Sequence, residues 1–455
     1  MNQSLISFAM KIKVETPIYD SSTKSVTIKL KSENETTAII KIGFQPLIPF
    51  ASKVSSEVVD FFIISACAYG IDRFVERKSY SVDGWSRELT VELPVTDVDK
   101  WLGVEGELEA LFSFLTGDYW HVCFYKTKFE YPQQKLPKEL EDSFSQVNLF
   151  SGGLDSLIGA INFLEAKPDE KLLLTSHYDP ELSARTEQIK LLEKLEMKYK
   201  GQFVHIDSID VTLLESTEEK ESTFRSRSIL FIGIALLVAQ TKSTPLIVPE
   251  NGSVSLNYPL SSSRRSACST RTTHPTFISI LRKLWNKLGI MTDISNPYEL
   301  FTKGEMVVNC ENIDFLKEIV QISNSCGKRG HRVNWENKTA SHCGICMPCT
   351  YRRAALLSID DATTYGNSIN KKLSGRKKFT PFLLTKQGQD ISACFNFLNR
   401  DLNKEEIKEE LLVAGITDLT KIDDYVEVVV RTRAELKKYV YMYGDDIIKK
   451  KAGLL

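Results

Sequence analysis

The sequence predicts an α/β protein whose middle part is a doubly wound parallel sheet, preceded by an α+β region and followed by a helical region. A short apolar run at Val147–Phe150 ends in a serine- and glycine-rich turn, and a helical pattern follows. From there to residue 248, β-prone runs alternate with helical runs, as in sheets built from βαβ units. Four cysteines near residue 340 then have the spacing of a metal-binding knuckle.

The composition is that of an ordinary globular protein. The chain has 455 residues, 42% of them hydrophobic and 26% charged, and its net charge is −1. This length predicts two or three domains. The balanced charge predicts no general attraction to nucleic acid or to a membrane surface, so direct nucleic-acid binding is not expected. No run of 18 apolar residues and no signal-peptide layout occurs, which favours a cytoplasmic protein without a membrane span.

Residues 1–140 are predicted to form an α+β accessory domain. Alternating or β-prone runs predict strands at 11–15, 24–30, 37–42, 87–94 and 121–130, and a long apolar run predicts a helix at 55–74. The region contains no motif that indicates chemistry. Gln133–Glu139 is predicted to be the linker to the next domain.

Residues 145–358 are predicted to form the parallel-sheet domain, and residues 371–455 a helical region. Strands are expected at 147–150, 172–176, 203–206 and 246–248, with helices beginning at Asp179 and spanning Thr223–Gln240. Ligands of such sheets bind beyond the carboxyl ends of the strands. The segments that directly follow strands are therefore the expected site: 151–156, 176–179, 207–210 and 250–253.

The turn after the first of these strands has the composition of a phosphate-binding loop. Its residues are Ser151, Gly152, Gly153, Leu154, Asp155 and Ser156. Glycines let a backbone approach an anion closely, and the N–H groups of a helix start point toward it. A carboxylate such as Asp155 fits beside phosphates when Mg²⁺ bridges the two. The sequence has no GxxxxGK[ST] motif. The alternative is a plain turn in which Asp155 caps the helix.

Two later strand ends add candidate ligand-binding groups. Arg225 and Arg227 precede the apolar helical run, where a positive charge opposes the helix dipole and is favoured only beside an anion. Solvated surface arginines are the alternative. Asn251, in the sequence PENG, directly follows the strand at 246–248 and would either contact a nucleotide or form an ordinary turn.

The segment Ser261–His274 reads SSSRRSACSTRTTH and is a polar, basic loop. Its arginines and hydroxyl groups suit an anionic substrate, so the substrate-binding candidates are Arg264, Arg271, Thr272 and His274. A lid or a solvent-exposed linker would have the same composition. His274 precedes Pro275 and is equally placed to cap the helix that follows.

Four cysteines form the clearest metal-site candidate: Cys326, Cys343, Cys346 and Cys349. Their spacing, C-x16-C-x2-C-x2-C, suits a tetrahedral Zn²⁺ that is structural, because four thiolates leave no open position. An iron–sulfur cluster is the main alternative. His331 and His342 flank the group as substitute ligands.

The hexapeptide SGGLDS, the TFRSRS segment at 223–228, the Thr302–Lys303 pair and the cysteine spacing resemble the QueC family over residues 145–358. QueC enzymes are 7-cyano-7-deazaguanine synthases with a PP-loop ATP pyrophosphatase fold. The resemblance implies that ATP is cleaved between its α- and β-phosphates while 7-carboxy-7-deazaguanine is adenylated. An amine then forms an amide, which QueC converts to a nitrile. It also implies catalytic roles for Asp155, Arg227 and Lys303.

The added regions at both ends and the loop ending in STRTTHP depart from QueC. They look more like the QatC family, the QueC-like proteins of four-component Qat anti-phage systems. This likeness implies other Qat-type proteins as partners, one of which accepts the deazaguanine acid at its N-terminal amine. Three alternatives stay open: a synthase acting with ammonia, a tRNA-modifying PP-loop enzyme, and a non-catalytic ATP-binding scaffold of a defence complex.

Overall fold

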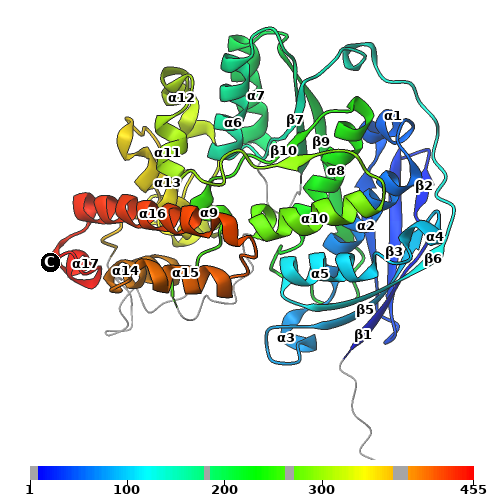
Figure 1. Cartoon of the computed structure of the whole chain (residues 1–455), viewed down its shortest axis with the longest axis horizontal. Helices are drawn as coiled ribbons and strands as arrows, with labels where there is room; N and C mark the ends of the chain where they lie inside the picture. The colour runs from blue at the N-terminus through cyan, green and yellow to red at the C-terminus, as the bar shows by residue number, and fades with distance from the viewer. Residues whose placement is uncertain (1–8, 179–184, 262–270, 372–387) are drawn as a thin grey trace, which may run out of the picture.

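The computed structural model describes residues 9–178, 185–261, 271–371 and 388–455. Its central feature is an eleven-stranded sheet with the order β11-β10-β7-β8-β9-β4-β3-β1-β5-β6, in which β2 also pairs with β3 (Figure 1). The strands are β1 (Met10–Val14), β2 (Ile18–Asp20), β3 (Ser25–Ser32), β4 (Thr37–Gly43), β5 (Glu88–Val95), β6 (Tyr119–Lys126), β7 (Gln146–Leu149), β8 (Leu172–Tyr178), β9 (Phe203–Leu214), β10 (Leu246–Ile247) and β11 (Ile294–Ser295). Neighbouring strands are parallel except where β3 or β4 is one of the pair.

The strands from β7 onward form the predicted parallel half of the sheet. Along the sheet they lie in the order β9-β8-β7-β10-β11. The chain therefore starts in the middle at β7, adds strands on one side, and then crosses to the other side at β10. This is the strand order of doubly wound folds, whose ligands bind where the winding direction reverses. In this protein the reversal lies between β7 and β10.

The two halves of the sheet are joined by β9. Its first part pairs in parallel with β8, and its last residues, Val211–Leu214, pair antiparallel with Ile39–Ile42 of β4. The predicted strand ended at Ile206, but the alternating residues that follow continue the extended backbone. The predicted boundary between residues 140 and 145 is therefore not a boundary of the sheet. The N-terminal region and the parallel half also share one apolar core.

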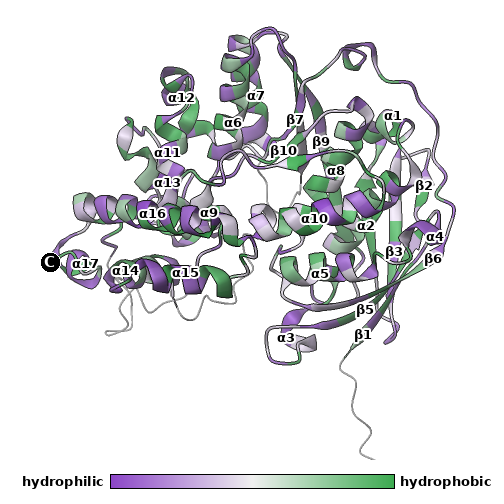
Figure 2. Ribbon diagram, in the orientation of Figure 1, coloured by the Kyte–Doolittle hydropathy of each residue, from purple (hydrophilic) through white to green (hydrophobic). Residues whose placement is uncertain are grey.

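Helices cover both faces of the parallel half. The helices α2 (Ser56–Phe74), α8 (Arg227–Lys242) and α10 (Pro275–Lys287) lie on one face, and α6 (Leu154–Ala166) and α7 (Arg185–Lys198) on the other. Leu173 of β8 packs in the α2 and α8 core, whereas its neighbours Leu172 and Leu174 pack in the α6 core. Figure 2 shows that α8 is hydrophobic over most of its length, as expected for a helix buried between a sheet and a second helix.

The remaining helices lie around the sheet and at the C-terminal end. They are α1 (Ile48–Ala51), α3 (Arg77–Tyr80), α4 (Val98–Trp101), α5 (Glu105–Thr116), α9 (Gly252–Ser255), α11 (Lys303–Val308), α12 (Ile313–Ile319), α13 (Met347–Ala355), α14 (Gln389–Asn399), α15 (Lys404–Val413), α16 (Ile422–Tyr443) and α17 (Asp446–Lys451). The last four form the predicted helical region, at the opposite end of the molecule from β1 and β5 (Figure 1).

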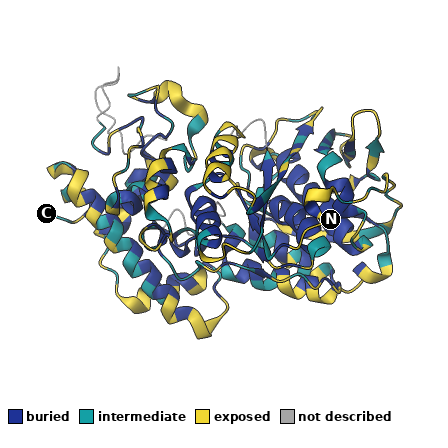
Figure 3. Cartoon of the chain, turned by 90° about the horizontal axis from the view of Figure 1, so that it is seen from above, coloured by how far each residue is buried: buried dark blue, intermediate teal, exposed yellow. Residues whose placement is uncertain are grey.

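The C-terminal helices share a core with the cysteine segment. Cys349, Phe395 of α14 and Tyr439 of α16 are buried in one apolar cluster. Figure 3 shows buried residues inside this end of the molecule and exposed residues on the outer helix faces. Within the described ranges, every helix is too short or too polar to cross a membrane.

Candidate functional site

The glycine loop connects β7 to α6 as predicted. Gly153 is the N-cap residue of α6, and no side chain caps this helix. Asp155 lies inside the first turn, so the alternative in which Asp155 is the helix cap is wrong. Gly152 has a φ of +77°, and a Cβ there would lie 2.8 Å from Cγ of Gln188. Glycine is thus required at residue 152 both for its backbone conformation and for the close packing of α7.

Three neighbouring segments hold the backbone carbonyls of this loop. The Ser176 hydroxyl, at the end of β8, donates to the Phe150 carbonyl at 2.7 Å. Gln188 Nε2 of α7 donates to the Ser151 carbonyl at 3.0 Å. The Asn324 amide, two residues before Cys326, donates to the Gly152 carbonyl at 2.8 Å. The loop conformation is therefore fixed from three sides.

A buried polar cluster lies directly after the loop. Lys303 Nζ is 2.7 and 2.6 Å from the two carboxylate oxygens of Asp155. Asn251 Nδ2 donates to the same carboxylate at 2.9 Å. All three side chains are buried. They come from the first turn of α6, the end of β10 and the start of α11, so three residues predicted at separate positions meet where the winding of the sheet reverses.

Glu250 is a fourth member of this cluster. Its carboxylate accepts from Asn251 Nδ2 at 3.3 Å. Burial and the charge of Asp155 raise the pKa of Glu250 well above its ordinary value. Burial would also raise the pKa of Asp155, but the charge of Lys303 and hydrogen bonds from Glu250, Lys303 and Asn251 lower it. Glu250 therefore holds a proton more readily than a free carboxyl group, and Asp155 less readily.

Sequence reasoning placed Glu250 in a strand-end segment but assigned it no role. The available signal was its position, because it follows β10 just as the glycine loop follows β7. Asn251 also serves the fold, since its Oδ1 accepts from the Val254 amide at 3.1 Å and caps α9. Asn251 therefore both forms the predicted turn and contacts Asp155.

The two predicted arginines lie at the start of α8, Arg225 two residues before it and Arg227 as its first residue. Arg225 is buried, donates to the Thr116 carbonyl at 2.7 Å and lies 4.0 Å from the ring centre of Trp85. A carbonyl and an aromatic face are thus two of the contacts of Arg225. Arg227 lies over Phe231 at 5.2 Å. Burial and the charge of Arg227 lower the pKa of His177, which belongs to β8. Arg227 is thus beside β8, while the Asp155 cluster is gathered over β7 and β10.

Of the predicted substrate loop, the structure describes Ser261 and the residues from Arg271 onward, and Arg264 lies outside the described residues. Arg271 donates to the Phe114 carbonyl of α5 at 2.8 Å. His274 is buried, packs against the Phe114 ring and accepts from the Thr276 amide at 3.2 Å. The prediction that His274 caps the following helix is confirmed. Thr272 lies between them in a short 3-10 turn and is half-buried. Their substrate role gains no support from this placement, because α5 and α10 hold Arg271 and His274.

The four predicted cysteines converge, with all their sulfur atoms within 4.8 Å of one another. The amides of Cys343 and Cys346 point at the sulfurs of Cys326 and Cys343, both at 3.2 Å. Gly344 has a φ of +81°, which permits the tight turn between them. Four sulfur donors stabilised by backbone amides fit the closed coordination shell of Zn²⁺. The group could therefore hold a structural zinc ion.

The neighbouring histidines do not replace a cysteine in this group. His342 Nε2 accepts from the Ser325 amide at 3.2 Å, and its Nδ1 is 2.8 Å from the Ser341 hydroxyl. His331 lies in an exposed 3-10 segment. The residues that could hold the ion are thus the four cysteines.

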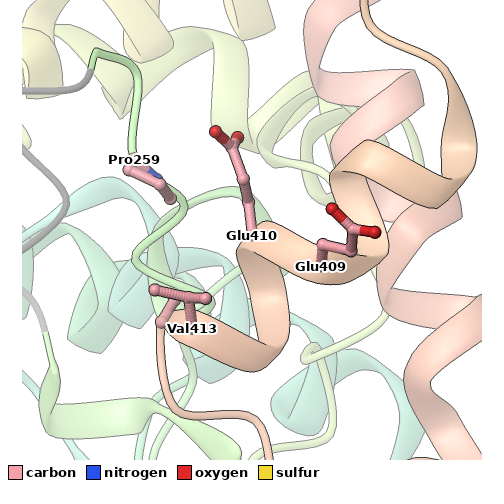
Figure 4. A pocket seen from close by; sticks show the side chains of 5 residues that line it. Pro259, Glu409, Glu410 and Val413 are labelled. Atoms are coloured by element: carbon pink, nitrogen blue, oxygen red, sulfur yellow. The ribbon is translucent and has the colours of Figure 1, made fainter.

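A pocket at the C-terminal end is separate from both centres (Figure 4). It lies between Pro259 and α15, where it is lined by Glu409, Glu410, Val413 and Ala414. Glu410 is bound there by Arg400 Nη2 at 2.7 Å. Among the described residues, none of the predicted site residues lines this pocket.

Comparison of the chain with protein-family models, with curated proteins and with solved structures gives no match. The functional interpretation therefore depends on the residues of the site itself.

Proposed function

We propose that the carboxyl edge of β7 and β10 binds ATP and that the protein is an ATP-dependent ligase that forms AMP and pyrophosphate. The observation that carries this proposal is the Asp155–Lys303–Asn251 cluster. It adjoins an uncapped, glycine-rich helix start at the reversal point of a doubly wound sheet. This combination of anion-binding backbone, buried lysine and carboxylate suits a nucleotide phosphate chain.

In the proposed complex, the loop Ser151–Ser156 binds the phosphates of ATP through its backbone amides and hydroxyl groups. Lys303 stabilises negative charge on the phosphate that is attacked. Asp155 and Glu250 supply the carboxylate oxygens that Mg²⁺ prefers, and they would hold the Mg²⁺ that accompanies ATP. That ion would supply charge neutralisation to the phosphates. The raised pKa of Glu250 fits this assignment, because two neighbouring carboxylates share one lysine.

The proposed reaction has two steps. A substrate carboxylate oxygen attacks the α-phosphorus of ATP, the bond to the β-phosphate oxygen breaks, and pyrophosphate leaves. An amine nitrogen then attacks the acyl carbon, the bond to the AMP oxygen breaks, and the amine loses a proton. Because SGGLDS, Thr302–Lys303 and the cysteine spacing resemble QueC, we propose 7-carboxy-7-deazaguanine as the acid.

The acceptor amine follows from the likeness to QatC. We propose the N-terminus of a partner protein from a Qat-type anti-phage system, with structural zinc at the four cysteines. Three other acceptors or roles are compatible with the same site. With ammonia the product would be an amide or nitrile nucleobase. A tRNA substrate is disfavoured by the net charge of −1. A scaffold would bind ATP without forming AMP.

Intact-protein mass spectrometry tests the proposal. The purified chain is incubated with ATP, Mg²⁺, 7-carboxy-7-deazaguanine and the proteins encoded beside it, and AMP is quantified in parallel. We expect one partner to gain the mass of the acid minus water. We expect Asp155→Asn to abolish both signals. Glu165→Gln is the matched control, because Glu165 is an acidic residue of the same helix that instead binds Tyr199 and Asn312.

The remaining outcomes separate the alternatives. AMP release with an amide or nitrile nucleobase, and without a partner mass shift, would assign the reaction to a synthase acting with ammonia. ATP binding without AMP would identify a scaffold. Absence of both ATP binding and AMP would overturn the proposal.

A further inference from the structure

One face of α16 packs against the two segments that carry Asn251 and Lys303. The residues on this face are three or four positions apart, namely Val428, Arg431, Thr432 and Glu435. The Thr432 hydroxyl is 2.5 Å from the hydroxyl of Ser253, which in turn accepts from the Lys303 amide at 3.3 Å. A helix from the C-terminal region thus reaches the backbone of the candidate site.

Glu435 makes the most direct of these contacts. It accepts from the Thr302 hydroxyl and, at 3.2 Å, from the Gly304 amide. Lys303 lies between these two residues, so one carboxylate binds both residues that flank it, one through a side chain and one through the backbone. Arg431 binds the same short helix from outside, with Nε 2.7 Å from Oε1 of Glu305.

Two glycines allow this close approach. A Cβ on Gly304 would lie 2.4 Å from Oε1 of Glu435, and a Cβ on Gly252 would lie 2.9 Å from Cγ1 of Val428. Gly304 directly follows Lys303, and Gly252 directly follows Asn251. Neither glycine has a positive φ. Close packing, and not an unusual backbone conformation, therefore favours a residue without a side chain at both positions. At Gly304 the close neighbour is the Glu435 carboxylate of α16, whereas at Gly252 the nearest atom is the Glu299 carbonyl oxygen, 2.3 Å from such a Cβ, and Val428 of α16 comes next.

We propose that α16 is a positioning element of the candidate site and that Glu435 holds the backbone from which Lys303 reaches Asp155. This inference rests on the proposed ATP site for its functional meaning. Its physical basis is preorganisation: when the two residues that flank a lysine are held in place, the lysine side chain loses little conformational freedom on binding its ligand. The C-terminal region then helps to position the residues of the candidate site.

Chemical labelling of Lys303 tests the positioning role without requiring activity. The full-length chain is treated briefly with an amine-acetylating reagent, and the rate at each lysine is measured by peptide mass spectrometry. Lys303 is buried and paired with Asp155, so it should be acetylated slowly. Lys242 is the internal reference, because its Nζ binds the Leu140 carbonyl far from α11 in the fold. ATP affinity is measured on the same samples.

Four variants separate positioning from general destabilisation. Glu435→Ala should accelerate acetylation of Lys303 about tenfold or more while Lys242 stays within about twofold, because two buried hydrogen bonds to a carboxylate are lost. Glu435→Gln retains an acceptor for the Gly304 amide and should stay near the wild-type rate. Glu427→Gln removes a carboxylate of the same helix that pairs with Lys404, and should change neither rate. Gly304→Ala should resemble Glu435→Ala, because its methyl group displaces Glu435.

The outcomes also distinguish this inference from the proposed function. Unchanged Lys303 acetylation in Glu435→Ala, or in Gly304→Ala if the former does not fold, would overturn the positioning role. An equal rise at Lys303 and Lys242 would likewise overturn it, because it would show only general loss of stability. A wild-type chain that binds no ATP but shows the expected acetylation pattern would contradict the proposed function and leave the positioning role standing. Weaker ATP binding in Glu435→Ala than in Glu435→Gln would support both.

Discussion

Two buried charge clusters in this protein differ in their balance of charge. The first, the N-terminal quartet, consists of Asp72, Arg77, Arg87 and Asp118. Its two guanidinium groups face two carboxylates, and all four residues are buried. The second is the candidate site, where Asp155 and Glu250 face the single cation of Lys303.

The pKa values record this difference. Burial would raise the pKa of Asp118, but the charge of Arg87 and hydrogen bonds from Arg87 and Arg77 lower it to about 2. In the candidate site, burial and Asp155 raise the pKa of Glu250. In a buried cluster with matched charges the loss of one member destabilises the fold, because it leaves a buried charge without its partner. A cluster with an excess of carboxyl groups favours an additional cation. The comparison thus separates a structural cluster from a candidate ligand site.

The cysteine group extends the comparison, because it has four ionisable thiols and no cationic member. Metal coordination by such a group contributes on the order of 10 kcal/mol, the largest effect we expect. Cys349→Ser should abolish zinc binding and lower the melting temperature strongly, measured by elemental analysis and thermal unfolding. Cys394→Ser, at a buried cysteine of α14, should retain zinc. A metal-free wild-type chain with undiminished stability would contradict the metal role.

The balanced quartet should be the next most sensitive to substitution. Arg87→Met leaves two buried carboxylates with only one guanidinium, and we expect a loss of about 3–5 kcal/mol in the free energy of unfolding. Chemical denaturation measures this loss. Lys13→Met, which removes the exposed Lys13–Glu92 pair on the adjoining strands, should cost less than about 1 kcal/mol. Similar losses in both variants would remove the distinction between buried and exposed pairs.

At the candidate site, ATP binding should change the free energy of unfolding more than a substitution does. ATP with Mg²⁺ at a hundred times its dissociation constant should stabilise the wild type by about 2.7 kcal/mol. Asp155→Asn should lose this ligand effect and change the stability of the free protein less than Arg87→Met does, because Glu250 can ionise and pair with Lys303. Thermal unfolding with and without ATP measures both quantities. Full ligand stabilisation in Asp155→Asn would contradict the site assignment.

Asp118 of the first cluster and Glu250 of the second should make the stability depend on pH in opposite directions. The pKa of Asp118 lies below its ordinary 3.8, so its contribution of roughly 2.5 kcal/mol is present above pH 3.8 and is lost as the pH falls toward 2. The pKa of Glu250 lies above its ordinary 4.5, so its contribution is present below pH 4.5 and is lost as the pH rises through the folded-state value.

Glu250→Gln isolates the second of these effects. Urea unfolding at a series of pH values measures the free energy of unfolding. As the pH rises, this free energy should fall less steeply in the variant than in the wild type, by up to about 1.4 kcal/mol per pH unit. The fall in stability at acid pH should be the same in both. An unchanged alkaline slope in Glu250→Gln would show that Glu250 does not carry the raised pKa.

The smallest expected effect concerns the arginine before α8. If Trp85 and the Thr116 carbonyl satisfy Arg225, then Trp85→Leu should cost about 0.5–1 kcal/mol of stability and leave ATP affinity unchanged. Isothermal titration and chemical denaturation measure the two quantities. A large loss of ATP affinity in Trp85→Leu would indicate that Arg225 binds an anion of the ligand.

Local patterns predicted the features that depend on neighbouring residues. The glycine loop, the cysteine spacing and the helix at 55–74 are short-range signals, and the structure contains each of them. Asn251 was a candidate because strand ends of parallel sheets meet at one edge. The Lys303 candidate came from the family resemblance, since a lysine at a helix start has no distinctive local pattern.

Features that depend on distant contacts were missed. The pairing of β4 with β9 joins two regions that composition and a linker-like segment had divided. Arg225 finds its partners on α5 and near Trp85, and no pattern around residue 225 signals them. The role of Glu435 depends on the packing of α16 against α11, more than 100 residues earlier in the chain. Tertiary contacts of this kind override the local preferences on which sequence patterns are based.

The pairing of β4 with β9 also bears on how the chain folds during its synthesis. Ile42 leaves the ribosome roughly 170 residues before its partner Val211. At about 5–20 residues per second, one edge of β4 is without its native partner for roughly 10 to 30 s. An open strand edge is a template for aggregation, and lysines on such strands oppose it. Lys41 lies within the paired stretch of β4, where its charge would protect the nascent chain until β9 arrives.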